Sequence, residues 1–188
     1  MNLLTDDLPR SVEIDGKDYP IVTDFRNWIR FFELIEDEKL SDSQRLRIAM
    51  LWFTEETPEA TEEAWEALLS FALCKDIPKS GKKSSDNAGK DAAAPCFSWS
   101  YDAPFILGAF WQTYGIDLLS CNIHWYEFFA LFQALPDDVP LKQRIALRQM
   151  KTADIKDRER RKQIRAAQRL IAIPRPALTA EQIGEAFM

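Results

Sequence analysis

Few side chains in this sequence could do chemistry, and the only histidine stands in a simple pair. His124 lies three residues before Glu127, a spacing that puts both side chains on one face of a helix. A carboxylate–histidine pair can bind iron or transfer a proton, but a di-metal helical bundle needs several such pairs. We therefore expect His124 to be a core side chain whose ring is hydrogen-bonded to a neighbour.

The three cysteines form no recognisable site either. Cys74, Cys96 and Cys121 are 22 and 25 residues apart, so there is no Cys-x-x-Cys pair, and one histidine cannot complete a zinc site. Residues 1–10 are acidic, whereas a secretory leader is basic and apolar; with the odd number of cysteines, this indicates a reducing cytoplasm. The sequence thus predicts no catalytic residue, no metal and no other cofactor.

Two motifs in a polar stretch look like parts of enzyme sites. Gly81-Lys82-Lys83-Ser84 resembles the end of a phosphate-binding loop, but Asp76 stands where the first glycine would be and no predicted strand precedes it. Ser80-x-x-Lys83 and Ser85-Asp86-Asn87 echo penicillin-binding motifs, which normally lie far apart in the sequence. We interpret both similarities as coincidence.

Charge is distributed unevenly along the chain. Residues 1–139 hold 12 basic and 25 acidic side chains, whereas residues 140–176 hold 12 basic and 3 acidic ones. Such asymmetry indicates either an interaction surface or pairing between the two halves. The basic run 154–169 has three readings, namely a solvated helix that balances the acidic half, a contact to an acidic protein partner, and a nucleic-acid contact. Arg160, Arg161 and Arg165 are the candidate partner-binding residues in this run.

Aromatic residues gather in the middle of the chain. The segment 97–132 holds 12 of the 22 aromatic side chains and no Lys or Arg, which argues against a platform for single-stranded nucleic acid. A helix over 123–135 is apolar almost all round and is predicted to be core or to lie against a partner, with Trp125 and Phe129 in the groove or its floor. No membrane is predicted, because the longest uncharged run has 14 residues and a spanning helix needs about 20.

Local signals predict a mainly α protein, a helical bundle with a small N-terminal β-hairpin. Asp15-Gly16 is typical of a tight hairpin turn. Asp24 can cap a helix over 25–35, whose inward face is predicted to comprise Phe25, Trp28, Ile29, Phe32 and Ile35. Ser41-x-x-Gln44 is a capping box, followed by an apolar stripe of Leu46, Ala49, Met50 and Phe53. Thr57-Pro58 indicates the next helix start. Further helices are predicted from Asp102 or Ser100 to Gly115, from Asn122 to 135, from Pro140 to 147, from Thr152 or Asp154 to 171, and from Thr179.

We expect one mostly helical domain over 1–188. It would comprise a hairpin and three helices over 1–74, a flexible linker over 75–97 that includes a flexible loop at about 78–95, an aromatic helical core over 98–150, and a basic helix followed by a C-terminal helix over 151–188.

Two blocks of the sequence resemble the bacteriophage gene-product-fifteen family of siphophages and prophages. The first is NLLTDDLPRSVEIDGKDYPIVTDFRNWIRF and the second is SYDAPFILGAFWQTYGIDLLSCNIHWYEFFALFQAL. The matching motifs are Asp15-Gly16, Tyr114-Gly115-Ile116-Asp117-Leu118 and His124-Trp125, and the resemblance covers most of residues 1–172. Ile123 stands where the family suggests Leu, a change that conserves volume.

The resemblance implies a small protein encoded between the tail-tube and tape-measure genes, with no catalytic residues. The function it implies is that of a non-enzymatic tail assembly chaperone in the host bacterial cytoplasm, with the tape-measure protein as partner and the tail-tube protein as a second one. A structural tail component retained in the virion, a nucleic-acid-binding regulator that uses the basic helix, and a homo-oligomer are the alternatives left open.

Overall fold

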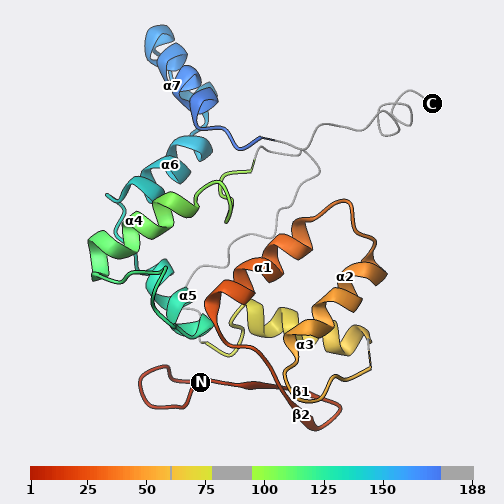
Figure 1. The fold of residues 1–188 in the computed structure, drawn as a ribbon. Coiled ribbons are helices and arrows are strands. Elements are labelled where there is room, and N and C mark those ends of the chain that lie inside the picture. Colours follow the sequence, from red (N-terminus) through yellow and green to blue (C-terminus); the bar gives the residue numbers. More distant parts are fainter. Residues whose placement is uncertain (60, 78–94, 175–188) are drawn as a thin grey trace, which may run out of the picture. The chain divides into compact units, whose positions relative to one another are not determined.

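The computed structural model describes residues 1–59, 61–77 and 95–174, and these residues are mainly helical (Figure 1). They form a two-stranded hairpin, seven α-helices and two short 3-10 turns. The predicted mainly α fold with an N-terminal hairpin is therefore confirmed. Residues 78–94 of the predicted flexible loop and linker, and the helix predicted from Thr179, lie outside the described residues.

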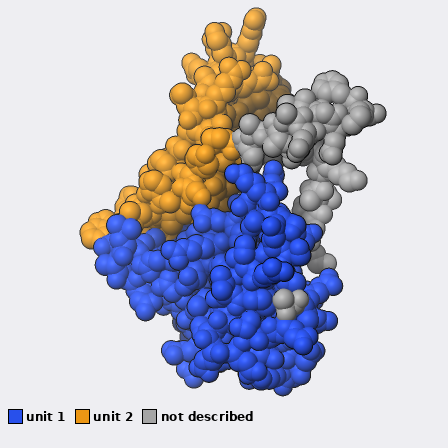
Figure 2. Space-filling view, turned by 45° about the vertical axis from the view of Figure 1, so that its right-hand side comes forward, with its two compact units in different colours: residues 1–86, 115–135 blue, residues 87–114, 136–188 orange. Residues whose placement is uncertain are grey.

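The chain forms two compact units, which are coloured separately in Figure 2. Unit 1 comprises residues 1–86 and 115–135, and unit 2 comprises residues 87–114 and 136–188. The predicted aromatic core segment 98–150 is thus shared between them, because its middle helix belongs to unit 1 and the helices on either side belong to unit 2. That the whole chain acts as one domain stays a prediction.

The hairpin opens unit 1 as predicted. Strands β1 (Ser11–Ile14) and β2 (Lys17–Pro20) pair antiparallel, and Val12 lies opposite Tyr19. The turn residues Asp15 and Gly16 have φ angles of 52° and 76°, the left-handed pair that a two-residue hairpin turn requires. Val12 and Ile14 are buried, and β1 packs against a helix of the same unit, so the hairpin rests on the helical core.

Helix α1 (Phe25–Glu36) begins at the predicted cap, because the Asp24 carboxylate accepts the N–H of Arg26. Its inward face agrees with the predicted one in part, since Phe25 and Trp28 are buried. Ile29, Phe32 and Ile35 are only half-buried. The buried line instead continues at a spacing of three residues, to Phe31 and Leu34. The reason is that two helices of unit 1 flank α1, so the line between them is the deepest part of its surface.

Helix α2 (Asp42–Ala49) has the complete predicted capping box of Ser41 and Gln44. It ends earlier than its apolar stripe predicted, since Phe53 lies outside it and pairs with Ile21 in an isolated bridge. Helix α3 (Glu62–Ala72) begins at Thr61, not at Thr57-Pro58. The Thr61 hydroxyl accepts the N–H of Ala64 and two glutamates follow it, a combination that Thr57 lacks.

Helix α5 (Trp125–Gln133) begins at His124 and not at the predicted Asn122. Tertiary contacts explain the later start, because the N–H of Trp125 donates to the carbonyl of Thr23 and the N–H of Phe25 donates to the carbonyl of Ile123. These bonds hold the chain before α5 extended against the entry to α1. Trp125, Tyr126 and Phe128 are buried, and the Phe25 and Phe128 rings stack 4.5 Å apart.

Unit 2 is built on α4 (Ala103–Tyr114), α6 (Pro140–Gln149) and α7 (Arg158–Leu170). The predicted stop after α4 and start of α6 are confirmed, with Gly115 at φ +67° and Pro140 at the first helical position. The basic helix begins later than predicted, because residues 152–154 form a separate 3-10 turn and the Asp157 carboxylate caps α7. Helix α6 packs against both α4 and α7.

Candidate partner-binding surface

Helix α7 is the most strongly charged element that the structure describes. It carries six cations and one carboxylate, Glu159. No side chain of α7 is buried, and within residues 1–59, 61–77 and 95–174 none of the six cations forms an ion pair with a carboxylate. Of the two explanations for the uneven charge, an interaction surface therefore has more support from α7 than pairing within the described chain.

The positions of these charges oppose the helix dipole. The N-terminal end of a helix is positive, so cations there are unfavourable by some tenths of a kcal/mol each. Arg158 and Arg160 stand in the first turn of α7, where only the Asp157 cap and Glu159 offset them. Helix stability alone would not favour this order of residues, whereas an acidic partner at this end of α7 would relieve the repulsion.

The cations of α7 do not all face the same way. A helix turns 100° per residue, so Arg158, Lys162, Arg165 and Arg169 lie along one side, which we call the cationic stripe. Of the three predicted partner-binding arginines, Arg165 is part of the stripe and donates from Nε to the Thr152 hydroxyl at 3.1 Å. Arg160 is exposed away from the stripe, and half-buried Arg161 donates to the carbonyl of Ile155.

Polar contacts attach one side of α7, which we call its inner side, to the rest of unit 2. The Gln168 side chain donates to the carbonyls of Leu147 at 2.9 Å and Met150 at 2.8 Å, both at the C-terminal end of α6. The Leu147 carbonyl also accepts the N–H of Met150, so the Gln168 amide supplies a further donor at this helix end. The helix is fixed along this side, and the cationic stripe lies next to it, with Arg165 and Arg169 near Gln168.

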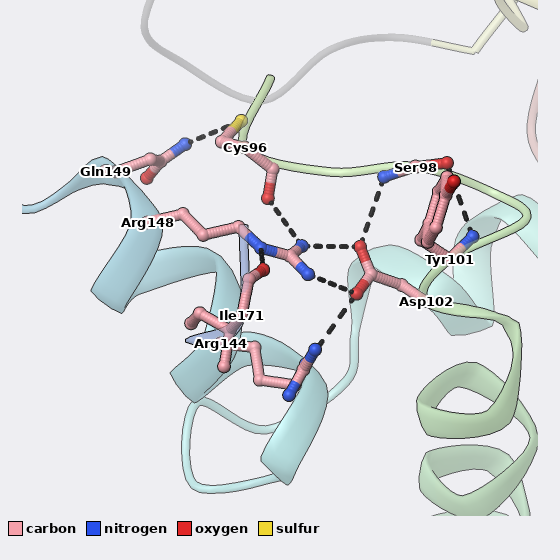
Figure 3. Close-up of polar contacts among 8 residues, drawn as sticks. All are labelled: Cys96, Ser98, Tyr101, Asp102, Arg144, Arg148, Gln149 and Ile171. Carbon is pink, nitrogen blue, oxygen red and sulfur yellow. Dashed lines mark hydrogen bonds and ion pairs between the residues drawn. The ribbon is translucent and has the colours of Figure 1, made fainter. Parts of the chain in front are cut away.

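A buried ion pair in unit 2 anchors the end of α7 (Figure 3). The Asp102 carboxylate accepts from both terminal nitrogens of Arg148, at 2.6 and 2.9 Å, and the side chains are 0% and 5% exposed respectively. The same guanidinium donates to the carbonyls of Ile171 at 2.8 Å and Cys96 at 3.1 Å. Arg148 therefore joins α6 to the residue before α4, to the loop segment at Cys96 and to the residue that follows α7.

Arg144 adds a second positive charge beside the same carboxylate. Its Nε lies 3.8 Å from the Asp102 carboxylate, at ion-pair distance but beyond a hydrogen bond, and its guanidinium lies 4.0 Å from the centre of the Phe105 ring. Sequence reasoning missed this cluster because Asp102 and Arg148 are 46 residues apart. The available signal was that Asp102 is the one charge at the head of a 14-residue uncharged run.

A cavity of about 430 Å³ lies beside the cationic stripe. Its lining combines guanidinium groups with small apolar side chains and comprises Pro95, Arg148, Arg165, Gln168, Arg169, Ala172 and Ile173. Arg148 is already paired with Asp102, so Arg165 and Arg169 are the cations available to a ligand there. Such a cavity fits a carboxylate on an apolar stem, as in an Asp or Glu side chain of a partner.

The aromatic part of the predicted surface belongs to unit 1, whereas the α7 arginines belong to unit 2. Trp125 is fully buried, and its indole N–H donates to the carbonyl of Ala72 at 2.9 Å. Phe129 is half-buried, with its ring 5.7 Å from that of Trp125. In this conformation Trp125 supports the surface from beneath and Phe129 reaches it. That these two residues bind a partner stays a prediction.

His124 has the structural role predicted from its surroundings. Its Nε2 lies 2.9 Å from the carbonyl of Pro9, and its Nδ1 accepts the N–H of Tyr126 at 3.1 Å, so Nε2 carries the proton. Burial lowers the pKa of His124, and the bond to Pro9 opposes that shift only in part. The ring is thus a neutral cap of α5, and Glu127 is exposed one turn on.

Other chemistry has little to build on in the described chain. Among its residues, no group of three or more His, Cys, Asp or Glu side chains could hold a metal ion. Cys74 is buried, and burial raises the pKa of the half-buried Cys121 thiol, which lowers its reactivity. No helix in this part of the chain has the length and apolar character to cross a bilayer.

Comparisons with known proteins agree with the resemblance drawn from the two sequence blocks. A family described as "Bacteriophage Gp15 protein" matches residues 4–173, which is most of the chain. This is not a known enzyme family. Neither the curated proteins nor the solved structures gave a match.

Proposed function

The chain belongs to the bacteriophage Gp15 family, and on that premise we propose that this phage protein is a non-enzymatic tail assembly factor. Its role would be that of a chaperone in the host bacterial cytoplasm, which binds the tape-measure protein before the tail tube forms around it. The tail-tube protein would be a second partner. Such a factor needs an exposed binding surface and no reaction chemistry.

One observation supports this proposal above the others, namely that α7 presents six cations without a carboxylate partner in the described residues. Charges at the edge of an interface accelerate association and select partners of opposite charge. The cavity beside Arg165 and Arg169 would seat an acidic side chain. We therefore propose an acidic segment of the tape-measure protein as the ligand of α7.

A nucleic-acid ligand has less support. The phosphate backbone is bound by basic surface, and residues 1–139 hold 25 acidic and 12 basic side chains, which would repel it. Binding to nucleic acid would also fall steeply as salt rises. A gel shift at low salt that disappears with rising salt, without capture of the tape-measure protein, would favour this alternative over the chaperone.

Co-expression with the tape-measure protein tests the proposal directly. The test variant reverses three exposed stripe residues, Arg158, Lys162 and Arg169, to Glu. Arg161 and Arg165 are left intact because their guanidinium groups hold the carbonyl of Ile155 and the hydroxyl of Thr152. Like charges at an interface cost several kcal/mol, so at least about tenfold less tape-measure protein should co-purify.

A matched control separates the site from net charge. Reversal of Arg30, Lys39 and Arg47 to Glu changes the charge by the same amount on exposed positions of unit 1. This control should retain binding. If wild type and both variants capture equal amounts of tape-measure protein, α7 is not part of the interface. If wild type captures none, the chaperone role is contradicted.

Analysis of purified phage particles separates an assembly factor from a structural component. A chaperone leaves when the tail is complete, so mass spectrometry should not detect this protein in mature virions. Its presence there in fixed proportion to the tail-tube protein would instead favour a structural tail component.

A further inference from the structure

Unit 1 has a groove of its own, separate from the α7 surface. It has a volume of about 370 Å³ and is lined by residues of α1, α2 and α3. Its apolar part is formed by Ile35, Leu46 and Trp65. The polar side chains at the groove are Asp42, Ser43, Arg45 and Glu62.

An acidic stretch of the sequence reaches this groove at Glu62. Residues 55–66 contain six glutamates and no Lys or Arg, and α3 begins within this run. Among the described residues, only Glu56 of these six forms an ion pair, with Lys17 at 2.6 Å. Arg45 also lies at the groove, but its guanidinium donates to the Asp42 carboxylate at 2.7 Å and to the carbonyl of Asp37, so its charge is paired within unit 1. The groove therefore combines an apolar floor with an adjoining acidic run, residues 55–66, which we call the acidic border.

Helix α7 presents the complementary arrangement. Leu170, at the C-terminal end of α7, is 88% exposed, so its apolar side chain is not buried within its own chain. Ala166 lies one turn before it, and the cationic stripe runs alongside. The outer side of α7 thus combines an apolar end with a row of cations.

We propose that α7 of a second copy of this chain docks in the unit 1 groove. Leu170 would contact Trp65 and Leu46, and the cationic stripe would pair with the glutamates of residues 55–66. The occupant is assigned by charge complementarity, since the acidic border and the cationic stripe are both present on every copy. An interface between two different surfaces is heterologous, so repetition gives a ring or an open chain of copies.

This inference does not rest on the proposed function, but the two share α7. A copy whose α7 is docked in a groove cannot offer the same helix to another acidic protein. Self-association would therefore compete with binding of such a partner.

Sedimentation velocity of the full chain tests the proposal. Wild type should associate with rising protein concentration at about 50 mM salt and less at about 500 mM, because surface charges are screened. Reversal of Arg158, Lys162 and Arg169 to Glu should weaken association by about tenfold or more. Reversal of Glu55, Glu59 and Glu66 to Lys should do the same; these residues are exposed and spare Glu62 and Glu63, which stabilise the start of α3.

Mixing the two variants identifies the second copy. The first has an acidic α7 and an acidic border, and the second has a basic α7 and a basic border. Neither should associate alone, but each offers the opposite charge to the other, so the mixture should form mixed oligomers. Leu170→Ser should weaken wild-type association without any change of charge.

Several results would overturn the proposal. A wild type that stays monomeric at low salt, or a mixture that stays monomeric, excludes a second copy in the groove. A chain that carries both sets of substitutions and is compact but monomeric would indicate pairing within one chain instead. The control reverses Glu13, Asp18 and Glu38 to Lys, exposed residues outside the acidic border, and should associate like wild type. Circular dichroism confirms that each variant is folded.

Discussion

Replacement of Asp102 by Asn should destabilise unit 2 more than any other isosteric change of a carboxylate there. The carboxylate is fully buried and accepts two hydrogen bonds from Arg148, whose side chain is only 5% exposed. Asn keeps the shape and one acceptor but removes the charge, so the guanidinium stays buried without a counter-ion. Removing one partner of a buried ion pair costs about 3–5 kcal/mol, and we expect a loss near about 3 kcal/mol because the amide oxygen still accepts one bond.

A second substitution should recover much of this loss. Asp102→Asn with Arg148→Met removes both charges, and a buried pair replaced by apolar side chains is often neutral. Recovery will be incomplete, because the carbonyls of Cys96 and Ile171 lose the donor that Arg148 provides. The double variant should regain at least half of the stability lost in the single one.

Hydrogen exchange with mass spectrometry is the suitable assay, because two compact units need not unfold together. A loss of about 3 kcal/mol corresponds to roughly 100-fold less protection of the most stable amides. The loss should appear in α4, α6 and α7, with α1 and α3 unchanged. The exposed Asp154, replaced by Asn, serves as the control in the same unit. A loss below about 1 kcal/mol, or a double variant no more stable than the single one, would refute the assignment of the cost to an unpaired buried charge.

Three further predictions concern other positions. Burial lowers the pKa of His124 below its ordinary value of 6.5. As the pH falls through that value, the unfolded chain takes up a proton that the folded chain excludes, so stability is lost. The urea midpoint should therefore decrease from about pH 7 to about pH 5, and His124→Asn, which can still cap α5, should reduce this decrease. Gly115→Ala should lower the free energy of unfolding by about 1 kcal/mol in thermal melts, because φ is +67°. No atom lies within 4 Å of the added Cβ, so backbone strain is the whole cost, and an unchanged melting temperature would contradict it. Arg158→Glu with Arg160→Glu should slow amide exchange in the first turn of α7, by about 0.3–1 kcal/mol for each reversal, and faster exchange would contradict the dipole argument.

Signals that act within a few residues could be read from the sequence. The Asp15-Gly16 turn, the Asp24 cap, the capping box at Ser41, the Gly115 stop and the Pro140 start all occur where they were predicted. Each depends on a side chain or a backbone angle that satisfies its own helix end or turn. Tertiary context adds little to that balance.

Features set by distant contacts could not be read in this way. Helix α5 starts late because its entry pairs with residues 23–25, about 100 positions earlier in the chain. The same holds for the inward face of α1, which depends on which helices flank it. For the candidate surface, the sequence located the α7 cations. It could not show that these cations have no carboxylate partner among residues 1–59, 61–77 and 95–174, or that Trp125 would be buried.

The order in which the segments of the two units follow one another has a consequence for synthesis and for engineering. The chain passes between the units after residues 86, 114 and 135, so unit 1 is incomplete until α5 has left the ribosome. By then α4 has already emerged, but α6, against which it packs, has not. During that interval, on the order of seconds at about 5–20 residues per second, the uncharged helix α4 is exposed without the helix against which it packs. A stop codon after residue 114 would remove the stacking partner of Phe25, so unit 1 cannot be obtained by simple truncation before residue 135.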